Sequence, residues 1–119
     1  MSEDLDADLL ATYLQRKERV KTRLKAVESR IKLLKKRHRT YRENFDTVVS
    51  SGVCPTCLQP LSLKYKYEYS ERISKMIRKV EGVLEDCNKE VDQLMTQLAE
   101  IDAKLDDIKR GSNSKQQTS

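Results

Sequence analysis

The stretch VKTRLKAVESRIKLL, residues 20–34, carries apolar side chains at alternating spacings of four and three residues. This is the spacing of positions a and d in a heptad repeat, lettered a to g, through which one helix packs along another. The series continues in both directions, and only Lys17 and His38 interrupt it. Its positions are Leu10, Tyr13, Lys17, Val20, Leu24, Val27, Ile31, Leu34, His38, Tyr41, Phe45 and Val48. We therefore predict that residues 1–51 form one long helix of a coiled coil.

The second half of the chain repeats the pattern. From Ser70 its a and d positions are Ile73, Ile77, Val80, Leu84, Cys87, Val91, Leu94, Leu98, Ile101, Leu105 and Ile108. Gly111 follows two basic residues, a typical helix C-terminus. We predict a second helix over residues 62–110, beginning anywhere between 62 and 71. The small, polar residues 111–119 are expected to form a disordered tail.

The two helices can pair if the chain folds back midway between Cys54 and Cys57. Residue i then faces residue 111 − i, so that Leu34 faces Ile77, and every a position meets a d position. A shift by a whole heptad keeps this match but needs an asymmetric loop. The first helix carries a basic flank and the second an acidic one, which favours the same orientation. The predicted fold is all-α, an antiparallel coiled-coil hairpin.

The turn between the helices, residues 52–61, contains the motif Cys54-Pro55-Thr56-Cys57 followed by Leu58. The C-x-x-C spacing is that of a zinc knuckle, but a structural zinc ion takes four ligands. The other candidates in the chain, Cys87 and His38, lie too far along the helices. We therefore expect a second copy of the chain to supply the other two thiolates, giving one Zn²⁺ per homodimer.

CPTCLQPLS at the apex of an antiparallel coiled coil resembles the zinc hook of the SbcC-type, SMC-like ATPases. These are the ATPase subunits of nuclease–ATPase complexes that process DNA double-strand breaks, and phage-encoded relatives are among them. The resemblance implies that Cys54 and Cys57 are the zinc ligands and that Pro55 shapes the turn. Leu58 departs from the pattern, because many members have Gly there. A non-glycine residue in the left-handed conformation costs on the order of 1 kcal/mol.

The resemblance also implies a function. Two zinc-linked copies would join the coiled-coil arms of a DNA-repair and recombination ATPase, whose partners are a nuclease subunit and DNA, and so tether its DNA-bound heads. This chain has no phosphate-binding G-x-x-x-x-G-K-[ST] motif and no cluster of His and Asp. We therefore expect it to be no enzyme by itself, and to be the middle of a longer protein or a free-standing relative of that part.

Composition limits the location and partners. No apolar run is long enough to span a membrane, and the acidic first residues do not resemble a secretory signal. Three cysteines leave one unpaired in any disulfide scheme, so we expect an intracellular, reducing setting. Cys87 is expected to be a small buried residue, His38 a packing residue, and Lys17 a residue that helps to fix the register.

Several alternatives remain open. A basic run below the turn could contact nucleic-acid phosphates through Lys35, Lys36, Arg37, Arg39 and Arg42. The chain would then be a coiled-coil finger that binds nucleic acid or a polymerase. Disulfide exchange by the C-x-x-C pair is a weaker alternative, since no thioredoxin-like βαβ pattern is present. The alternating tyrosines of LSLKYKYEYS could also pair with FDTVVSSGV as a short β-ribbon beside the turn.

Overall fold

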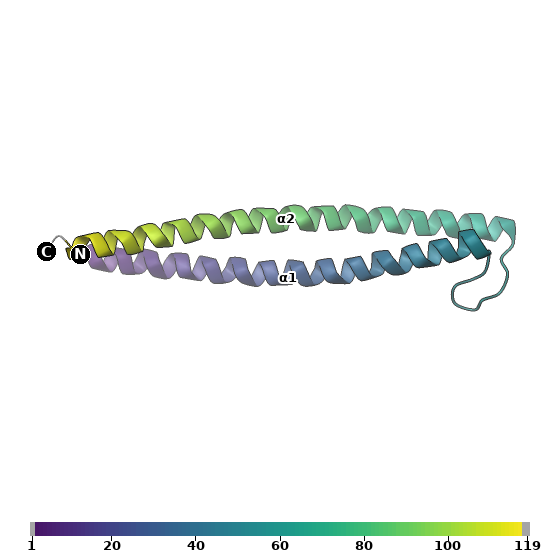
Figure 1. Ribbon diagram of the computed structural model, residues 1–119, viewed down its shortest axis with the longest axis horizontal. Coiled ribbons are helices and arrows are strands. Elements are labelled where there is room, and N and C mark those ends of the chain that lie inside the picture. The colour runs from purple at the N-terminus through teal and green to yellow at the C-terminus, as the bar shows by residue number, and fades with distance from the viewer. Residues whose placement is uncertain (1, 118–119) are drawn as a thin grey trace. The chain divides into compact units, whose positions relative to one another are not determined.

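The computed structural model describes residues 2–117 and the side-chain surroundings of residues 6–111. Over this range the chain forms two helices, α1 at Ser2–Ser51 and α2 at Leu63–Gln117, joined by a turn over residues 52–62 (Figure 1). The start of α2 at Leu63 lies inside the predicted interval. The helix then continues past Gly111 to Gln117, where the sequence predicted a tail. A helical glycine costs only about 1 kcal/mol relative to alanine, so it does not have to end a helix.

The β-ribbon, which the sequence left open as an alternative to a helix, does not form in the described residues. Within residues 2–117 the only strand-like pairing is one isolated antiparallel bridge between Val53 and Pro60. The FDTVVSS segment belongs to α1 and the tyrosine segment to α2. The alternating tyrosines misled because a helix also uses them: Tyr67 Oη donates a hydrogen bond to Glu71 Oε1 one turn ahead, at 3.1 Å.

The chain divides into two compact units, which we describe separately. The terminal unit holds the described parts of Met1–Glu28 and Lys89–Ser119, and the tip unit is Ser29–Asn88. Within each unit the two helices run antiparallel and bury the predicted a and d positions. Every such position between residues 10 and 108 is buried or half-buried. The buried apolar residues are Val27, Leu34, Val48, Ile73, Ile77, Cys87, Leu94, Ile101 and Leu105, and all of them lie at a or d.

The predicted pairing of the helices was wrong by one heptad. In the terminal unit Lys17 Nζ lies 2.8 Å from Asp102 Oδ1, and in the tip unit His38 Nε2 lies 2.9 Å from Glu81 Oε1. The predicted pairing would place each acidic partner eight residues too far along, about 12 Å of helix. A shift of seven residues, so that residue i faces residue 118 − i, brings each pair to adjacent positions.

The asymmetric turn explains this shift. α1 ends at Ser51 and α2 begins at Leu63. The first turn of α2 extends past the end of α1 (Figure 1). When residue i faces residue 118 − i, the midpoint of the pairing lies at Gln59 and not between Cys54 and Cys57. The a-to-d match could not reveal this, because it is unchanged by a slip of seven residues.

Candidate metal centre

The turn between α1 and α2 is closed by backbone hydrogen bonds at its base. Gly52 ends α1 in the left-handed conformation, with φ 67°, and its N–H donates to the carbonyl oxygen of Val48 at 3.0 Å. Leu61 N–H donates to the carbonyl oxygen of Gly52 at 2.8 Å, which joins the two sides. Ser62 then caps α2: its Oγ accepts a hydrogen bond from Tyr65 N–H at 3.3 Å.

Two further hydrogen bonds shape the cysteine motif itself. Cys54 N–H donates to the carbonyl oxygen of Gln59, and Leu58 N–H donates to the carbonyl oxygen of Cys54, both at 2.9 Å. The second bond folds residues 54–58 into a single tight turn. Leu58 completes it with φ 61°, in the left-handed region. The residue that departs from the zinc-hook pattern therefore adopts a conformation in which glycine is unstrained.

The fold of this turn brings Cys54 and Cys57 within 3.6 Å of each other. Both are free thiols; Cys54 is half-buried and Cys57 is exposed. The backbone N–H groups of Cys57 and Thr56, followed by the Cys57 side chain, donate hydrogen bonds to Cys54 and hold the pKa of its thiol below the ordinary value. A lower pKa favours the thiolate, which is the form that binds metals.

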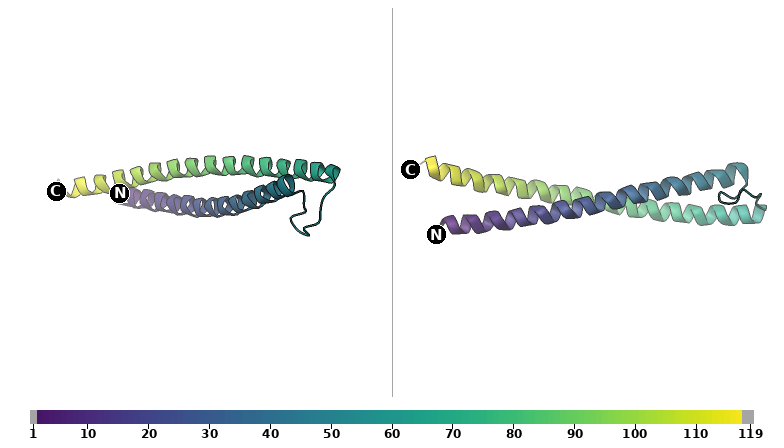
Figure 2. Two further views of the ribbon diagram at one scale, coloured as in Figure 1. Left: turned by 45° about the vertical axis from the view of Figure 1, so that its right-hand side comes forward. Right: turned by 90° about the horizontal axis from the view of Figure 1, so that it is seen from below.

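Tyr69 of α2 lies near this cysteine. Burial raises the pKa of Tyr69, and the negative charge of the Cys54 thiolate raises it further. Leu58 and Leu63, at the outer end of the turn, are among the most exposed apolar residues, at 71% and 86%. Figure 2 shows the turn displaced to one side of the helix ends and not continuing along them. Residues 56–60 of the turn are exposed, whereas Cys54 and Pro55 are half-buried.

Cys54 and Cys57 are two thiols, whereas a tetrahedral structural zinc site takes four ligands. Among residues 6–111 no group of three or more His, Cys, Asp or Glu side chains is placed to hold a metal ion. Cys87 is buried among the apolar residues of the coiled coil, as expected. His38 is hydrogen-bonded to Glu81. Neither residue joins the cysteine pair, so among residues 6–111 the turn brings together two thiols and no third metal-binding side chain.

The five basic residues predicted to contact nucleic acid, Lys35, Lys36, Arg37, Arg39 and Arg42, are all exposed on α1. Lys35, Arg39 and Arg42 are spaced by four and three residues and therefore share one side of the helix, whereas Arg37 lies on another side. Arg37 lines a groove between α1 and α2, where Arg30 and Lys79 join it. The run of basic letters could not reveal Arg30 and Lys79 as neighbours of Arg37. The heptad positions, with Arg30 and Arg37 both at g, were the available signal.

Comparison of the chain with protein-family models, with curated proteins and with solved structures gave no match. Among the helices that the structure describes, none is both long and apolar enough to cross a membrane.

Proposed function

We propose that the chain is a zinc-dependent homodimerisation module, in which Cys54 and Cys57 of two copies bind one Zn²⁺. The observation that carries the proposal is the geometry of the cysteine pair. Two thiolates bound tetrahedrally to one zinc ion at about 2.3 Å lie roughly 3.8 Å apart. The two cysteines are already within 3.6 Å, in a turn whose N–H groups favour the Cys54 thiolate.

The second copy follows from ligand counting. Structural zinc takes four protein ligands, and the described part of the chain offers two at this place. A two-fold axis through the metal would supply the other two from an identical turn and would close the assembly as a dimer. The exposure of Cys57 and of the neighbouring Leu58 leaves room for the second turn to approach.

The zinc-mediated contact would link two coiled coils. Each zinc-linked copy would bring one antiparallel helix pair, so the metal would join two arms end to end. In a longer ATPase of the zinc-hook type, this junction would tether two DNA-bound heads, with a nuclease subunit and DNA as partners of the whole protein. The chain itself would be a structural module of a reducing, intracellular compartment and would catalyse no reaction.

The decisive experiment measures metal content and mass in solution for the same samples. We expect the wild-type chain to be a dimer with one zinc per two chains under reducing conditions. Cys54→Ser should be monomeric and free of zinc, because two sulfurs would remain per pair of copies. Cys87→Ser is the matched control and should keep both metal and dimer, since Cys87 is buried in the helix pairing.

Two outcomes would overturn the proposal. One is a dimer that persists after exhaustive chelation under reducing conditions, which would mean that other surfaces hold the copies together. The other is one zinc ion per monomer, which would require ligands that a single chain brings together in some other way.

A further inference from the structure

One face of the tip unit carries three basic residues that form no ion pair with another described residue. It contains a groove of about 340 Å³ between α1 and α2. The residues that matter along it are Arg30, Arg37, Tyr41, Met76, Lys79 and Val83, and we call this feature the basic groove. Arg30, Arg37 and Lys79 are exposed. Among residues 6–111, no carboxylate forms an ion pair with any of the three.

The heptad positions explain why these charges remain unneutralised. Arg30 and Arg37 occupy g positions of α1, and the g positions across the groove hold Val83 and Met76. In the terminal unit, by contrast, Arg23 occupies a g position and its Nε donates to Glu90 Oε1 at 2.6 Å. Arg30 and Arg37 form no such g-to-g ion pair, because the g residues opposite them are apolar.

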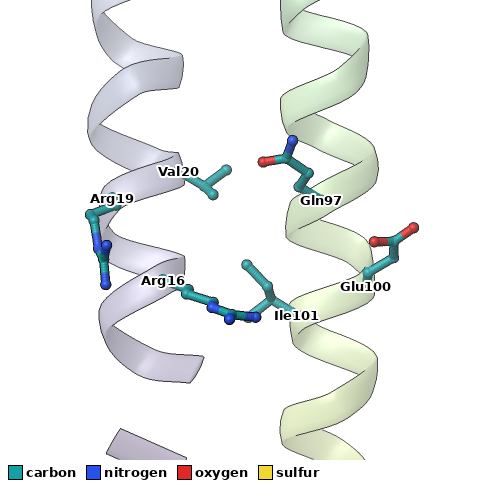
Figure 3. Close-up of a pocket in the computed structure, with 6 residues that line it drawn as sticks. All are labelled: Arg16, Arg19, Val20, Gln97, Glu100 and Ile101. Atoms are coloured by element: carbon teal, nitrogen blue, oxygen red, sulfur yellow. The ribbon is translucent and has the colours of Figure 1, made fainter. Parts of the chain in front are cut away.

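A groove on the terminal unit shows the contrast. It is lined by Arg16, Arg19, Val20, Gln97, Glu100 and Ile101, and Figure 3 shows Arg16 extending across it toward Ile101. Arg16 is again a g residue, but here Gln97 and the carboxylate of Glu100 belong to the same lining. The basic groove of the tip unit has three cations and no carboxylate in its lining. The two grooves have the same volume, about 340 Å³, and differ in the charge of their lining residues.

The rest of this face is also more basic than acidic. The g and c positions of the heptad series in the tip unit hold four basic residues, Arg30, Arg37, Arg72 and Lys79, and one acidic residue, Asp86. The e and b positions, on the other side of the helix pair, hold five basic residues and the four acidic residues Asp46, Glu71, Glu81 and Glu85. The net charge is therefore +3 on the g and c side and +1 on the e and b side.

We propose that the basic groove binds the phosphate backbone of a nucleic acid. Arg30 and Arg37 are seven residues apart, about 10.5 Å along α1, with Lys79 on the opposite helix. Cations on both rims suit a chain of evenly spaced phosphates. An acidic amphipathic helix is a poorer occupant, because such a helix inserts apolar anchors into a hydrophobic pocket. Here Leu34, in the floor of the groove, is only 8% exposed, and Met76, at 39%, is the exposed apolar residue of the lining.

This proposal is independent of zinc binding, so it can be tested in the Cys54→Ser background. The groove variant combines Arg30→Gln, Arg37→Gln and Lys79→Gln. The matched control combines Lys32→Gln, Arg39→Gln and Arg78→Gln. It removes the same charge from the same unit, at exposed b positions on the other side of the helices. Circular dichroism of both variants verifies that the helices are retained.

The measurement is fluorescence anisotropy with a labelled single-stranded oligonucleotide of about 30 nucleotides, titrated at salt concentrations from about 50 to 200 mM. We expect the unsubstituted groove to bind and to weaken steeply with salt. The groove variant should lose at least about ten-fold in affinity, and the slope of log K against log salt should fall by about two to three. The control should lose less than about three-fold, because its three cations lie away from the phosphates.

Three results would overturn the proposal. The first is the absence of binding at about 50 mM salt, where phosphate contacts are strongest. The second is an equal loss of affinity in the groove variant and the control, which would mean that binding depends on net charge and not on the groove. The third is tighter binding of an acidic peptide than of the oligonucleotide, which would assign the groove to a protein partner. None of these results depends on whether zinc joins two copies.

Discussion

Leu58 adopts the left-handed backbone conformation, with φ 61°, which residues other than glycine rarely adopt. A side chain with a β-carbon is strained in this region, and glycine is not. We expect Leu58→Gly to raise the free energy of unfolding of the metal-free protein by about 0.5 to 1 kcal/mol, after the added freedom of the unfolded chain is counted. The shift of the urea midpoint measures this change. Leu58→Ala is the control and should show no gain, because alanine keeps the β-carbon.

Cys54 differs from an ordinary thiol because backbone donors of Cys57 and Thr56 face its sulfur. Its lowered pKa keeps the thiolate populated at pH values where a free thiol is protonated, and this advantage is lost as the pH falls through the lowered value. In a variant with Cys57→Ser and Cys87→Ser, the Cys57 backbone N–H is retained. We expect the alkylation rate of Cys54 with iodoacetamide to have its pH midpoint below that of the same variant in concentrated urea. Equal midpoints in the two conditions would contradict the assignment.

At the scale of the helices, two polar a positions choose the register. Lys17 and His38 are separated by three heptads, and so are their acidic partners Asp102 and Glu81. A slip of one heptad in one direction would bring Met95 and Ser74 to the partner positions, and a slip in the other would bring Lys109 and Asn88. Only the observed register gives both polar residues an acid. Polar groups at core positions are known to specify register in this way.

Moving the acids should therefore move the register. We expect a composition-preserving swap to favour the pairing that is one heptad away. It combines Met95→Asp with Asp102→Met, and Ser74→Glu with Glu81→Ser. Engineered disulfides report the outcome in a background without native cysteines: Val27→Cys with Val91→Cys for the observed register, and Val20→Cys with Val91→Cys for the slipped one.

Without the swap, the cysteine pair at 27 and 91 should cross-link as the main product, and the pair at 20 and 91 should cross-link poorly. With the swap, this preference should reverse. The two engineered pairs serve as controls for each other, because both retain the cysteine at position 91. An unchanged preference after the swap would mean that apolar packing or the turn, and not the two polar contacts of Lys17 and His38, fixes the register.

At the scale of the whole molecule, the net positive charge and the cysteine pair both belong to the tip unit. The tip unit contains thirteen basic and seven acidic residues, a net charge of +6, whereas the rest of the chain has eleven and twelve, a net charge of −1. The overall charge of +5 thus comes from the tip unit alone. The cysteine pair and the basic groove lie in that same unit. The terminal unit neutralises its own charges with interhelical pairs such as Arg23 with Glu90.

The sequence by itself determined the two helices and the face that each one buries. The a and d positions can be read along the chain because burial in a coiled coil repeats with the heptad. The position of the cysteine turn was equally clear, because Gly52, Pro55 and Pro60 fall in the gap between the two heptad series. The conformational demand on Leu58 was anticipated only through the resemblance to the zinc hook, in which many members have Gly at this place.

Only the tertiary structure decided how the two helices align and which charges become neighbours. The a-to-d match repeats every seven residues, so it could not distinguish the predicted register from the observed one. The ion pair of Lys17 with Asp102 and the hydrogen bond of His38 with Glu81 made that distinction. The basic groove is likewise a property of two helices, since Lys79 reaches Arg30 and Arg37 only after the chain has reversed. Periodicity acts along one helix, whereas register and surface charge depend on the distances between two.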